Sequence, residues 1–445
     1  MLLFERAEPL AAAERWSPQL RLWSERALPG GEKSRAWGAT RAPENPAVMA
    51  STVVNPGLEG IVVGETVLSN VEGEVGRLTY RGYDIHELAE NATYEEVVHL
   101  LLFGQLPTHH ELIELNARLA ARRALPSGLL AIMHAIPRDA WPMDVLRTGV
   151  SAVAHFVPHH PDGAHDTSIE TAIDLIAKVP TIVAAWDRMR RRLDPIAPDP
   201  KLTTAANFLY MRSGEVPIPE AEDALDTYLV LLADHSYNAS TFSSRVTAST
   251  GADIYAAITA AVATLAGDLH GGAPSKVMTM LEEIGLPEKA EPYVRELLGR
   301  GQKIMGMGHR EYKIRDPRAS HLEQMAKNLT EKSHTKWYLI ARALEDASNK
   351  VLQELKPGKR IYANVEFYTA PTLSSLEIPS DEFTCMFACG RIAGWTAHVL
   401  EQFSHNRLIR PQATYVGPEI HPYEPIGGRR AHNGTPNGTA STVSP

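Results

Sequence analysis

Apolar residues recur at helical spacing along most of the chain, and this pattern predicts a mainly α-helical protein. Residues 169–192 are one example, because Ile169, Ile173 and Ile176 fall on one face of a helix with 3.6 residues per turn. Proline lacks a backbone N–H, so Pro180 is expected to kink or break this helix.

Helix boundaries carry recognisable capping signals. Thr93 with Glu96, and Thr167 with Glu170, have the spacing of a capping box, in which each side chain bonds the other residue's backbone N–H. Towards the C-terminus, residues 383–403 predict one long helix.

Short β-prone runs are confined to residues 58–80. The runs 61–63 and 66–68 are separated by a glycine, and 77–80 follow two more glycines, so small hairpins are expected. Residues 361–370 are expected to be extended or irregular. The predicted fold class is therefore mainly α, with a short N-terminal β-hairpin region.

Composition and charge narrow the class of protein. The chain has 445 residues, of which 44% are apolar and 22% charged, as in ordinary globular proteins. Its net charge of −9 argues against nucleic-acid binding. The sequence has no apolar run of about 18 residues, which argues against a membrane span. It also has no strand–helix alternation or phosphate-loop signature, so nucleotide-binding folds are not expected.

The cysteines and the two ends of the chain add further expectations. Cys385 and Cys389 are too few for a disulfide framework or a thiol-based zinc site, so reduced core cysteines and a cytoplasmic location are expected. Residues 1–48 fit neither a secretory signal nor a transit peptide and predict a poorly ordered N-terminal extension. Residues 431–445 are rich in small and polar residues and predict a mobile tail.

Residues 305–318 contain the first candidate for chemistry. Gly306 and Gly308 precede His309, and several basic residues follow. Glycine lets the backbone approach a ligand closely. A histidine beside a basic loop suits an anionic substrate and proton transfer near neutral pH. A solvated surface loop with an isolated histidine is the alternative.

Two other histidines stand at informative positions. His270 precedes two glycines and a proline, which places it at or just before a helix N-terminus, where the helix dipole disfavours an imidazolium. A neutral histidine there could donate a hydrogen bond to a carbonyl oxygen. The glycines could equally serve only a tight turn, and His235 could be an ordinary helix-end histidine.

Glu366 and Arg391 are charged residues in apolar surroundings. Glu366 lies between a valine and a phenylalanine, and desolvation would raise its pKa and strengthen it as a base. Simple alternation would instead give a solvent-facing glutamate. Arg391 lies within an apolar predicted helix and needs a carboxylate partner from the protein or a ligand. For Arg410, after that helix, surface solvation is the default expectation.

In this order and spacing, the motifs resemble citrate synthase over residues 56–418. The segments that carry the resemblance are GLEG at 57–60, YRGYDI at 80–85, His235 with NAST at 238–241, LHGGA at 269–273, GHR at 308–310, DPR at 316–318, NVEFY at 364–368 and IRP at 409–411.

The resemblance implies a two-domain helical homodimer with the active site between the domains. The large domain would comprise residues 50–270 and 377–430, and the small domain residues 271–376. The implied reaction is a Claisen-type condensation of acetyl-CoA with oxaloacetate, followed by hydrolysis of the citryl thioester. Acetyl-CoA would be a cosubstrate, with no permanently bound cofactor and no metal.

The resemblance also implies roles for individual residues. Glu366 would be the base, His270 would hydrogen-bond the thioester oxygen, and His309 would polarise the ketone of oxaloacetate and protonate the alkoxide. The residues implied to hold the substrate carboxylates are His235, Arg318, Arg391 and, from the neighbouring subunit, Arg410. The residues implied to contact CoA are Met305, Gly306, Met307, Gly308 and Lys313.

Two features depart from the family pattern. The base is usually an aspartate, whereas Glu366 is one methylene longer, and residues 273–275 read APS where ANE is common. The same residues would serve a 2-methylcitrate synthase that uses propionyl-CoA, since one methylene of pocket space is worth only about 1–3 kcal/mol. A non-catalytic paralogue that binds CoA or an acid is a third hypothesis, motivated by the glutamate.

Overall fold

The computed structural model describes residues 55–157, 169–309, 311–333, 335–355, 357–358 and 361–429. Contacts divide the described chain into two units, of which residues 62–413 form the larger body and residues 55–61 with 414–429 belong to the other. The predictions for residues 1–48 and 431–445 lie outside the described residues.

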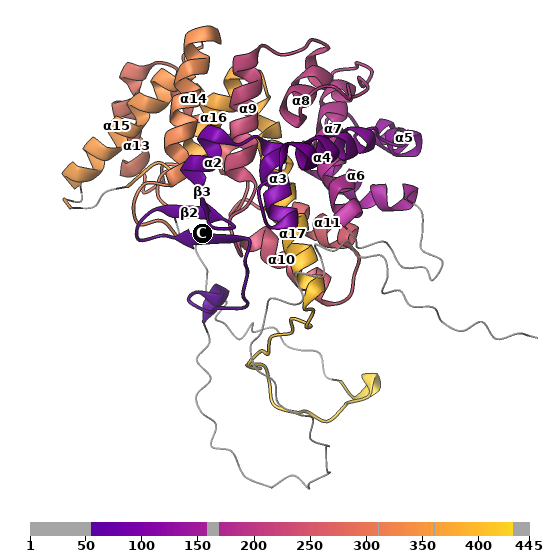
Figure 1. The fold of residues 1–445 in the computed structure, drawn as a ribbon. Helices are drawn as coiled ribbons and strands as arrows, with labels where there is room; N and C mark the ends of the chain where they lie inside the picture. Colours follow the sequence, from indigo (N-terminus) through magenta and orange to yellow (C-terminus); the bar gives the residue numbers. More distant parts are fainter. Residues whose placement is uncertain are drawn as a thin grey trace, which may run out of the picture. The chain divides into compact units, whose positions relative to one another are not determined.

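The body is built mainly from α-helices, as predicted, and carries one small antiparallel sheet (Figure 1). The strands are β1 (Ser69–Glu72), β2 (Arg77–Tyr80) and β3 (Tyr83–Asp84). The α-helices are α2 (Ile85–Asn91), α3 (Tyr94–Phe103), α4 (His109–Arg122), α5 (Ser127–Ala135), α6 (Pro142–Val153), α7 (Ile169–Arg190), α8 (Thr204–Ser213), α9 (Pro219–Leu232), α10 (Ala239–Ser249), α11 (Ile254–Leu265), α12 (Ala273–Ile284), α13 (Ala290–Gly299), α14 (Pro317–Ser333), α15 (Trp337–Leu355), α16 (Val365–Ser375) and α17 (Phe383–Ser404). Short 3-10 helices are η2 (Pro56–Leu58), η3 (Ala154–Phe156), η4 (Pro287–Lys289), η5 (Ser380–Glu382) and η6 (Ile426–Gly428). Among the helices that the structure describes, none is long and apolar enough to cross a membrane.

The sheet confirms the predicted β region but begins later than expected. Its strands pair in the order β1-β2-β3, with Ser69 opposite Tyr80. The earlier runs 61–63 and 66–68 are not strands. Leu78 and Tyr80 are fully buried, whereas Val62 is 87% exposed, so the run 61–63 lacks the buried face that β2 has.

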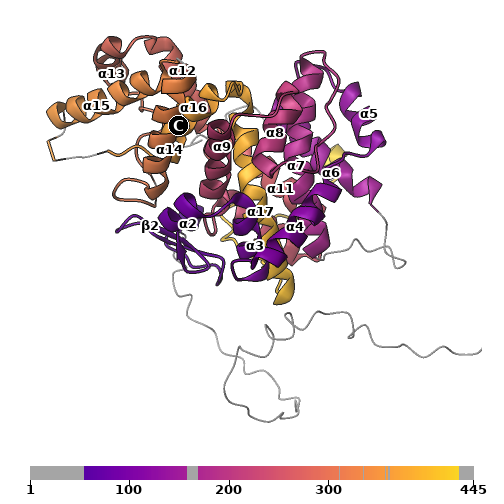
Figure 2. The same ribbon diagram turned by 45° about the horizontal axis from the view of Figure 1, so that its top comes forward.

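α17 is the central helix of the body. It packs against α3, α7, α9, α10 and α11, and Figure 2 shows it in gold beside α9 and α11. Cys385 and Cys389 lie on this helix as free, buried thiols, as predicted. Gly394 allows the end of α9 to approach, because an added Cβ would lie only 2.3 Å from the carbonyl oxygen of Ala233.

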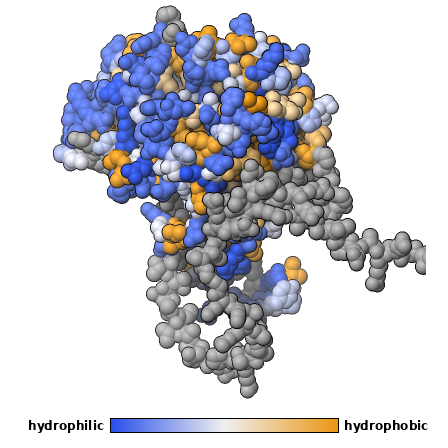
Figure 3. Space-filling view, viewed as in Figure 1, coloured by the Kyte–Doolittle hydropathy of each residue, from blue (hydrophilic) through white to orange (hydrophobic). Residues whose placement is uncertain are grey.

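Helices α12 to α16 form a second group within the body. α14 and α12 both pack against α16, and α13 packs against α15; Figure 2 shows these helices together, with colours from rose to amber. α14 also packs against α2 and α9, which lie outside this second group of helices. On the face shown in Figure 3, hydrophilic side chains dominate and apolar ones are scattered among them.

The capping box predicted at the start of α3 is present. The backbone N–H of Thr93 donates to Glu96 Oε2 at 2.7 Å, and the backbone N–H of Glu96 donates to Thr93 Oγ1 at 3.3 Å. Gly104 ends the helix in the left-handed conformation, with φ 86°.

Pro180 was expected to kink or break its helix, and the structure excludes the break. The helix runs as one element from Ile169 to Arg190 with Pro180 buried inside it. Packing against α6, α8 and α17 on several sides outweighs the local cost of the proline. Thr167, half of the predicted capping box, lies outside the described residues.

The expectation of an extended segment over 361–370 was wrong from Val365 onward, where α16 begins. Asn364 is its N-cap and accepts a hydrogen bond from the backbone N–H of Phe367 at 3.3 Å. The β-prone side chains that follow Asn364 obscured this helix start in the sequence.

Candidate active site

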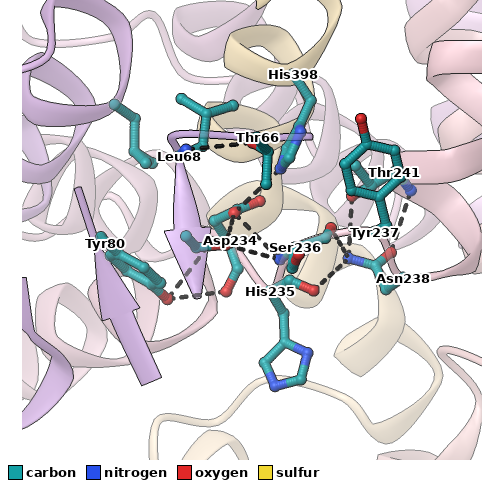
Figure 4. Close-up of polar contacts among 12 residues, drawn as sticks. Thr66, Leu68, Tyr80, Asp234, His235, Ser236, Tyr237, Asn238, Thr241 and His398 are labelled. Atoms are coloured by element: carbon teal, nitrogen blue, oxygen red, sulfur yellow. Dashed lines mark hydrogen bonds and ion pairs between the residues drawn. The ribbon is translucent and has the colours of Figure 1, made fainter. Parts of the chain in front are cut away.

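The site begins where the chain leaves α9, at Asp234 and His235. Asp234 is fully buried, and its Oδ2 accepts hydrogen bonds from Ser69 Oγ at 2.5 Å and from His398 Nε2 at 3.2 Å. Burial disfavours the charge, but His398, Arg391 and the hydrogen bond from Ser69 together hold the pKa of Asp234 below its usual value. Figure 4 shows this network, with the His235 imidazole pointing away from it. The network therefore fixes the backbone that carries His235.

The His235 imidazole is buried among other aromatic side chains. Its Nε2 lies 3.1 Å from Tyr312 Oη, and its ring centroid lies 5.8 Å from that of His309. Burial, reinforced by Arg318 and Arg391, holds the pKa of His235 well below its usual value. His235 is therefore neutral at neutral pH.

His309 is held in one tautomer by the turn that follows it. Its Nδ1 accepts the backbone N–H groups of Glu311 at 3.0 Å and Tyr312 at 3.1 Å. Since a backbone N–H can only donate, Nδ1 is unprotonated and the neutral ring carries its proton on Nε2. Burial, reinforced by Arg318, lowers the pKa of His309 to about 4.

The glycines before His309 join this loop to the start of α16. Met307 forms a β-bridge with Ala363, and the backbone N–H of Asn364 donates to the carbonyl of Gly306 at 3.0 Å. Gly306 has φ 74°, and an added Cβ would lie 3.0 Å from Phe367 Cα in the first turn of α16. Only glycine fits there without strain.

His270 lies three residues before the first residue of α12, as predicted, and takes the opposite tautomer. The backbone N–H of Ser240 donates to His270 Nε2 at 3.3 Å, and Ser240 Oγ lies 2.8 Å from the same nitrogen. The neutral ring therefore carries its proton on Nδ1. Burial, reinforced by Arg391, lowers the pKa of His270 to about 4.

Glu366 lies in the first turn of α16, with a buried and unpaired carboxylate oxygen. No hydrogen-bond partner of its Oε2 occurs among the residues that the structure describes. Burial raises the pKa of Glu366, and the positive charge of Arg318 only partly opposes this. A carboxylate with a raised pKa and a free lone pair is suited to accept a proton.

The two buried arginines are held differently. Arg318 forms a two-point ion pair with Asp316, with Nε–Oδ1 at 3.0 Å and NH2–Oδ2 at 2.7 Å. Arg391 donates from Nε to the carbonyl of Leu232 at 2.7 Å, but it makes no ion pair with a carboxylate in the described part of the chain. Burial lowers the pKa of Arg391 to about 10, so it remains charged. A buried guanidinium in this state calls for an anionic ligand.

Six of the predicted residues come from distant segments but lie close enough for their charges to interact. They are His235, His270, His309, Arg318, Glu366 and Arg391. Arg391 acts on the charge of His235, His270 and Glu366. Arg318 acts on His235, Glu366 and His309 as well. These six residues are therefore near neighbours in the body.

The seventh, Arg410, does not join them within one chain. It is exposed, and its NH1 donates to the carbonyl of its own neighbour Pro411 at 3.5 Å. Its predicted role depends on a second copy of the chain.

A cavity of about 280 Å³ opens beside His309. Of the predicted CoA-contact residues, Gly308 and Lys313 line it, whereas the half-buried Met305 and Met307 and the buried Gly306 do not. The other lining residues are Tyr312, Ile314, Asp316, Ile361, Tyr362 and Ala363. A concave site of mixed polarity next to a candidate acid is a suitable place for a substrate.

Sequence reasoning missed the residues that hold the candidates in place. Ser240 fixes the tautomer of His270, Tyr312 contacts His235, and Asp316 pairs with Arg318. Only the short Asp316–Arg318 spacing was a usable signal in the sequence. The contacts of Ser240 and Tyr312 with the histidines join residues 30 and 77 positions apart, which no local pattern shows.

Taken together, these groups define an acid–base site for an anionic substrate, built on a helical scaffold. Two neutral imidazoles offer N–H donors, one carboxylate has a raised pKa, and two arginines supply positive charge. Across the described residues, no group of three or more His, Cys, Asp or Glu side chains is arranged to hold a metal ion.

Comparison with known proteins agrees with this class. The family model for the citrate synthase C-terminal domain matches residues 57–412. The chain is 42% identical to the citrate synthase of Synechocystis over 389 residues, covering 86% of this chain and 97% of the relative. It is 37% identical to a 2-methylcitrate synthase of Shewanella oneidensis, covering 85% and 99% of the two chains.

A solved structure gives the same result. The ternary complex of carboxymethyl coenzyme A and oxaloacetate with citrate synthase from Thermoplasma acidophilum matches with a TM-score of 0.78 and 32% identity, covering 85% of this chain and 100% of that one. The chain belongs to the citrate synthase family, whose members are acyltransferases that convert the acyl group into an alkyl group on transfer.

Proposed function

We propose that this enzyme condenses acetyl-CoA with oxaloacetate and hydrolyses the resulting citryl thioester to citrate and CoA. The observation that carries the proposal is the opposite proton placement on two neutral histidines, Nδ1–H on His270 and Nε2–H on His309. A condensation of this kind needs one hydrogen-bond donor for the thioester oxygen and another for the ketone oxygen.

In the first step Glu366 removes a proton from the acetyl methyl group. Its raised pKa strengthens it as a base, and its unpaired Oε2 is available to receive the proton. His270 donates its Nδ1–H to the thioester oxygen and stabilises the enol that forms. The backbone N–H of Ser240 holds the ring in the orientation and tautomer that this requires.

In the second step the enol carbon attacks the ketone carbon of oxaloacetate. His309 donates its Nε2–H to the ketone oxygen and passes this proton to the alkoxide as negative charge develops there. The proton that Glu366 took from the methyl group, relayed through the water that enters for hydrolysis, returns the His309 ring to its neutral form and Glu366 to its ionised form. Because the pKa of His309 is low, its ring is neutral at neutral pH and can donate its Nε2–H as a hydrogen bond. Water then hydrolyses the thioester and releases CoA.

The substrate carboxylates are held by His235, Arg318 and Arg391, with Arg410 of a second subunit completing the site. Arg391 has the strongest case, because its buried guanidinium lacks a carboxylate partner within the described residues. Arg318 is already aligned by Asp316 and offers its remaining donors to the substrate.

Acetyl-CoA serves as a cosubstrate and binds along the loop from Met305 to Gly308. The glycines bring the backbone close to the ligand, and Lys313 meets its phosphates at the cavity beside His309. The complex of the Thermoplasma relative with carboxymethyl coenzyme A supports the binding of a CoA thioester by this enzyme.

The site operates between two domains, residues 50–270 with 377–430 and residues 271–376. The two places where the chain passes between these proposed domains lie side by side, as a hinge requires. Ser275 Oγ donates to the carbonyl of Ser380 at 2.7 Å, and Thr384 Oγ1 donates to the carbonyl of Gly271 at 2.9 Å. Closure of the two domains about these adjacent connections would exclude water until condensation is complete.

We propose a homodimer as the active form, because Arg410 is exposed and its proposed role requires a site on another copy of the chain. We place the enzyme in the cytoplasm, in keeping with its two free thiols, and in the tricarboxylic acid cycle.

The test is a steady-state assay of thiol release with oxaloacetate and either acetyl-CoA or propionyl-CoA. We expect higher kcat/KM with acetyl-CoA. Preference for propionyl-CoA would identify a 2-methylcitrate synthase, which is the name of the Shewanella relative. Release with neither substrate would contradict both and favour a non-catalytic binding role.

A further inference from the structure

α2 and α14 each present a histidine to the other, away from the site described above. His86 Nδ1 and His321 Nε2 lie 2.7 Å apart, and the ring centroids are 5.0 Å apart. His86 is exposed and His321 is half-buried, so solvent reaches the pair. The two helices pack together and lie side by side in Figures 1 and 2.

His86 lies in the first turn of α2 and His321 in the second turn of α14. The backbone N–H of His86 donates to Asp84 Oδ1 at 2.9 Å, which caps α2. The turn before α14 is fixed by the buried Asp316, whose backbone carbonyl accepts the N–H of Ala319 at 3.0 Å. The two rings are therefore presented by rigid elements, and the pair is preorganised.

Two facing imidazole nitrogens are the ligands that Zn²⁺, Cu²⁺ and Ni²⁺ prefer. Tetrahedral Zn²⁺ with Zn–N bonds of about 2.0–2.1 Å sets its two nitrogens about 3.4 Å apart. The rings need to separate by less than about 1 Å to reach that geometry. Burial and the neighbouring His86 lower the pKa of His321, so its imidazole is neutral and free to bind a metal ion, while the carboxylates of Glu90 and Asp84 act in the opposite sense and favour a cation.

We propose that His86 and His321 form a binding site for a divalent transition-metal ion such as Zn²⁺, with water completing the coordination shell. The ion takes the place of the proton that the two rings share. The described residues contain no arrangement of three or more metal-binding side chains, so this site has two protein ligands and binds more weakly than a four-ligand structural site.

The site has a mechanical consequence that rests on the proposed domain division. α2 belongs to the proposed large domain and α14 to the small domain. An ion held by both histidines ties the two domains together and restrains their relative movement.

The test is calorimetric titration of the full-length, chelator-treated protein with Zn²⁺. The chain has 18 histidines, so the difference between variants decides the outcome and not the total binding. We expect His86→Ala and His321→Ala each to lose one Zn²⁺ per chain, or at least about tenfold in affinity at that site. The double variant should lose no more than either single variant. The exposed His110→Ala is the matched control and should bind like wild type. Unchanged stoichiometry and affinity in the two variants would overturn the site.

Measurements of turnover test the tie between the domains separately from metal binding. Zn²⁺ should lower kcat of the wild type reversibly, with recovery on adding a chelator, and should affect His86→Ala less. Zn²⁺ binding that leaves kcat unchanged would overturn the tie between domains. The binding measurement itself does not depend on catalysis, so it stands even if the proposed reaction fails.

Discussion

The backbone N–H of Ser240 points at Nε2 of His270, with 3.3 Å between the two nitrogens. A main-chain donor cannot reverse its role, so this contact fixes the proton of His270 on Nδ1. The backbone N–H groups of Glu311 and Tyr312 impose the opposite choice on His309. The fold thus sets the direction of both hydrogen-bond donors before a substrate arrives.

Replacing His270 tests the first donor. In His270→Ala we expect kcat to fall by about 10²–10⁴-fold, because the enol loses its hydrogen bond. Oxaloacetate affinity, measured by calorimetry, should stay near the wild-type value. His110→Ala removes an exposed imidazole on α4 and should leave kcat unchanged. A His270→Ala enzyme with near wild-type turnover would exclude His270 from catalysis.

The pH profile tests the base. Burial raises the pKa of Glu366 above its usual 4.5, whereas the pKa values of His270 and His309 lie at about 4. Glu366 acts as the base only when ionised. As pH falls, kcat/KM should therefore drop through a midpoint above 4.5, before either histidine gains a proton. A profile that stays level down to pH 4.5 would show that protonation of Glu366 does not limit the reaction.

Replacing Arg391 distinguishes an effect on oxaloacetate binding from an effect on the stability of the fold. Arg391→Met keeps the volume of the side chain and removes a buried charge that has no carboxylate partner in the described chain. We expect oxaloacetate binding to weaken by about 2–5 kcal/mol. The free energy of unfolding should stay within about 1 kcal/mol of wild type or increase, because a buried charge is costly. Strong destabilisation with intact binding would show that Arg391 is structural.

Replacing Gly394 tests the packing of α17 against the segment that carries Asp234 and His235. An added Cβ at this position would lie 2.3 Å from Ala233 O and 2.4 Å from Asp234 Oδ1. Gly394→Ala should lower the free energy of unfolding by about 1–3 kcal/mol and raise KM for oxaloacetate. Denaturant unfolding and steady-state kinetics measure the two effects. Gly299→Ala, where no atom lies within 4 Å of the added Cβ, is the control and should be neutral or stabilising.

The sequence predicts local structure well where the signal is local. The capping box at Thr93, the long helix over 383–403 and the position of His270 before α12 follow from residues a few positions apart. Of the kink or break expected at Pro180, the break does not occur, because the packing around α7, which joins distant segments, outweighs the local preference.

The candidate site shows the same limit. Glu366 could be suspected from its apolar neighbours, but α16 itself was missed because Asn364 caps a helix made of β-prone residues. Ser240 and Tyr312 could not be assigned, since their contacts with histidines depend on how separate helices pack.

The most direct test of the central claim follows the carbon–carbon bond itself. Acetyl-CoA labelled with ¹³C is incubated with oxaloacetate, and NMR detects the label in citrate. We predict labelled citrate with the wild type and none above background with Glu366→Gln, while calorimetry shows that the variant still binds oxaloacetate. Labelled citrate formed at the wild-type rate by Glu366→Gln, or its absence with the wild type, would contradict the account.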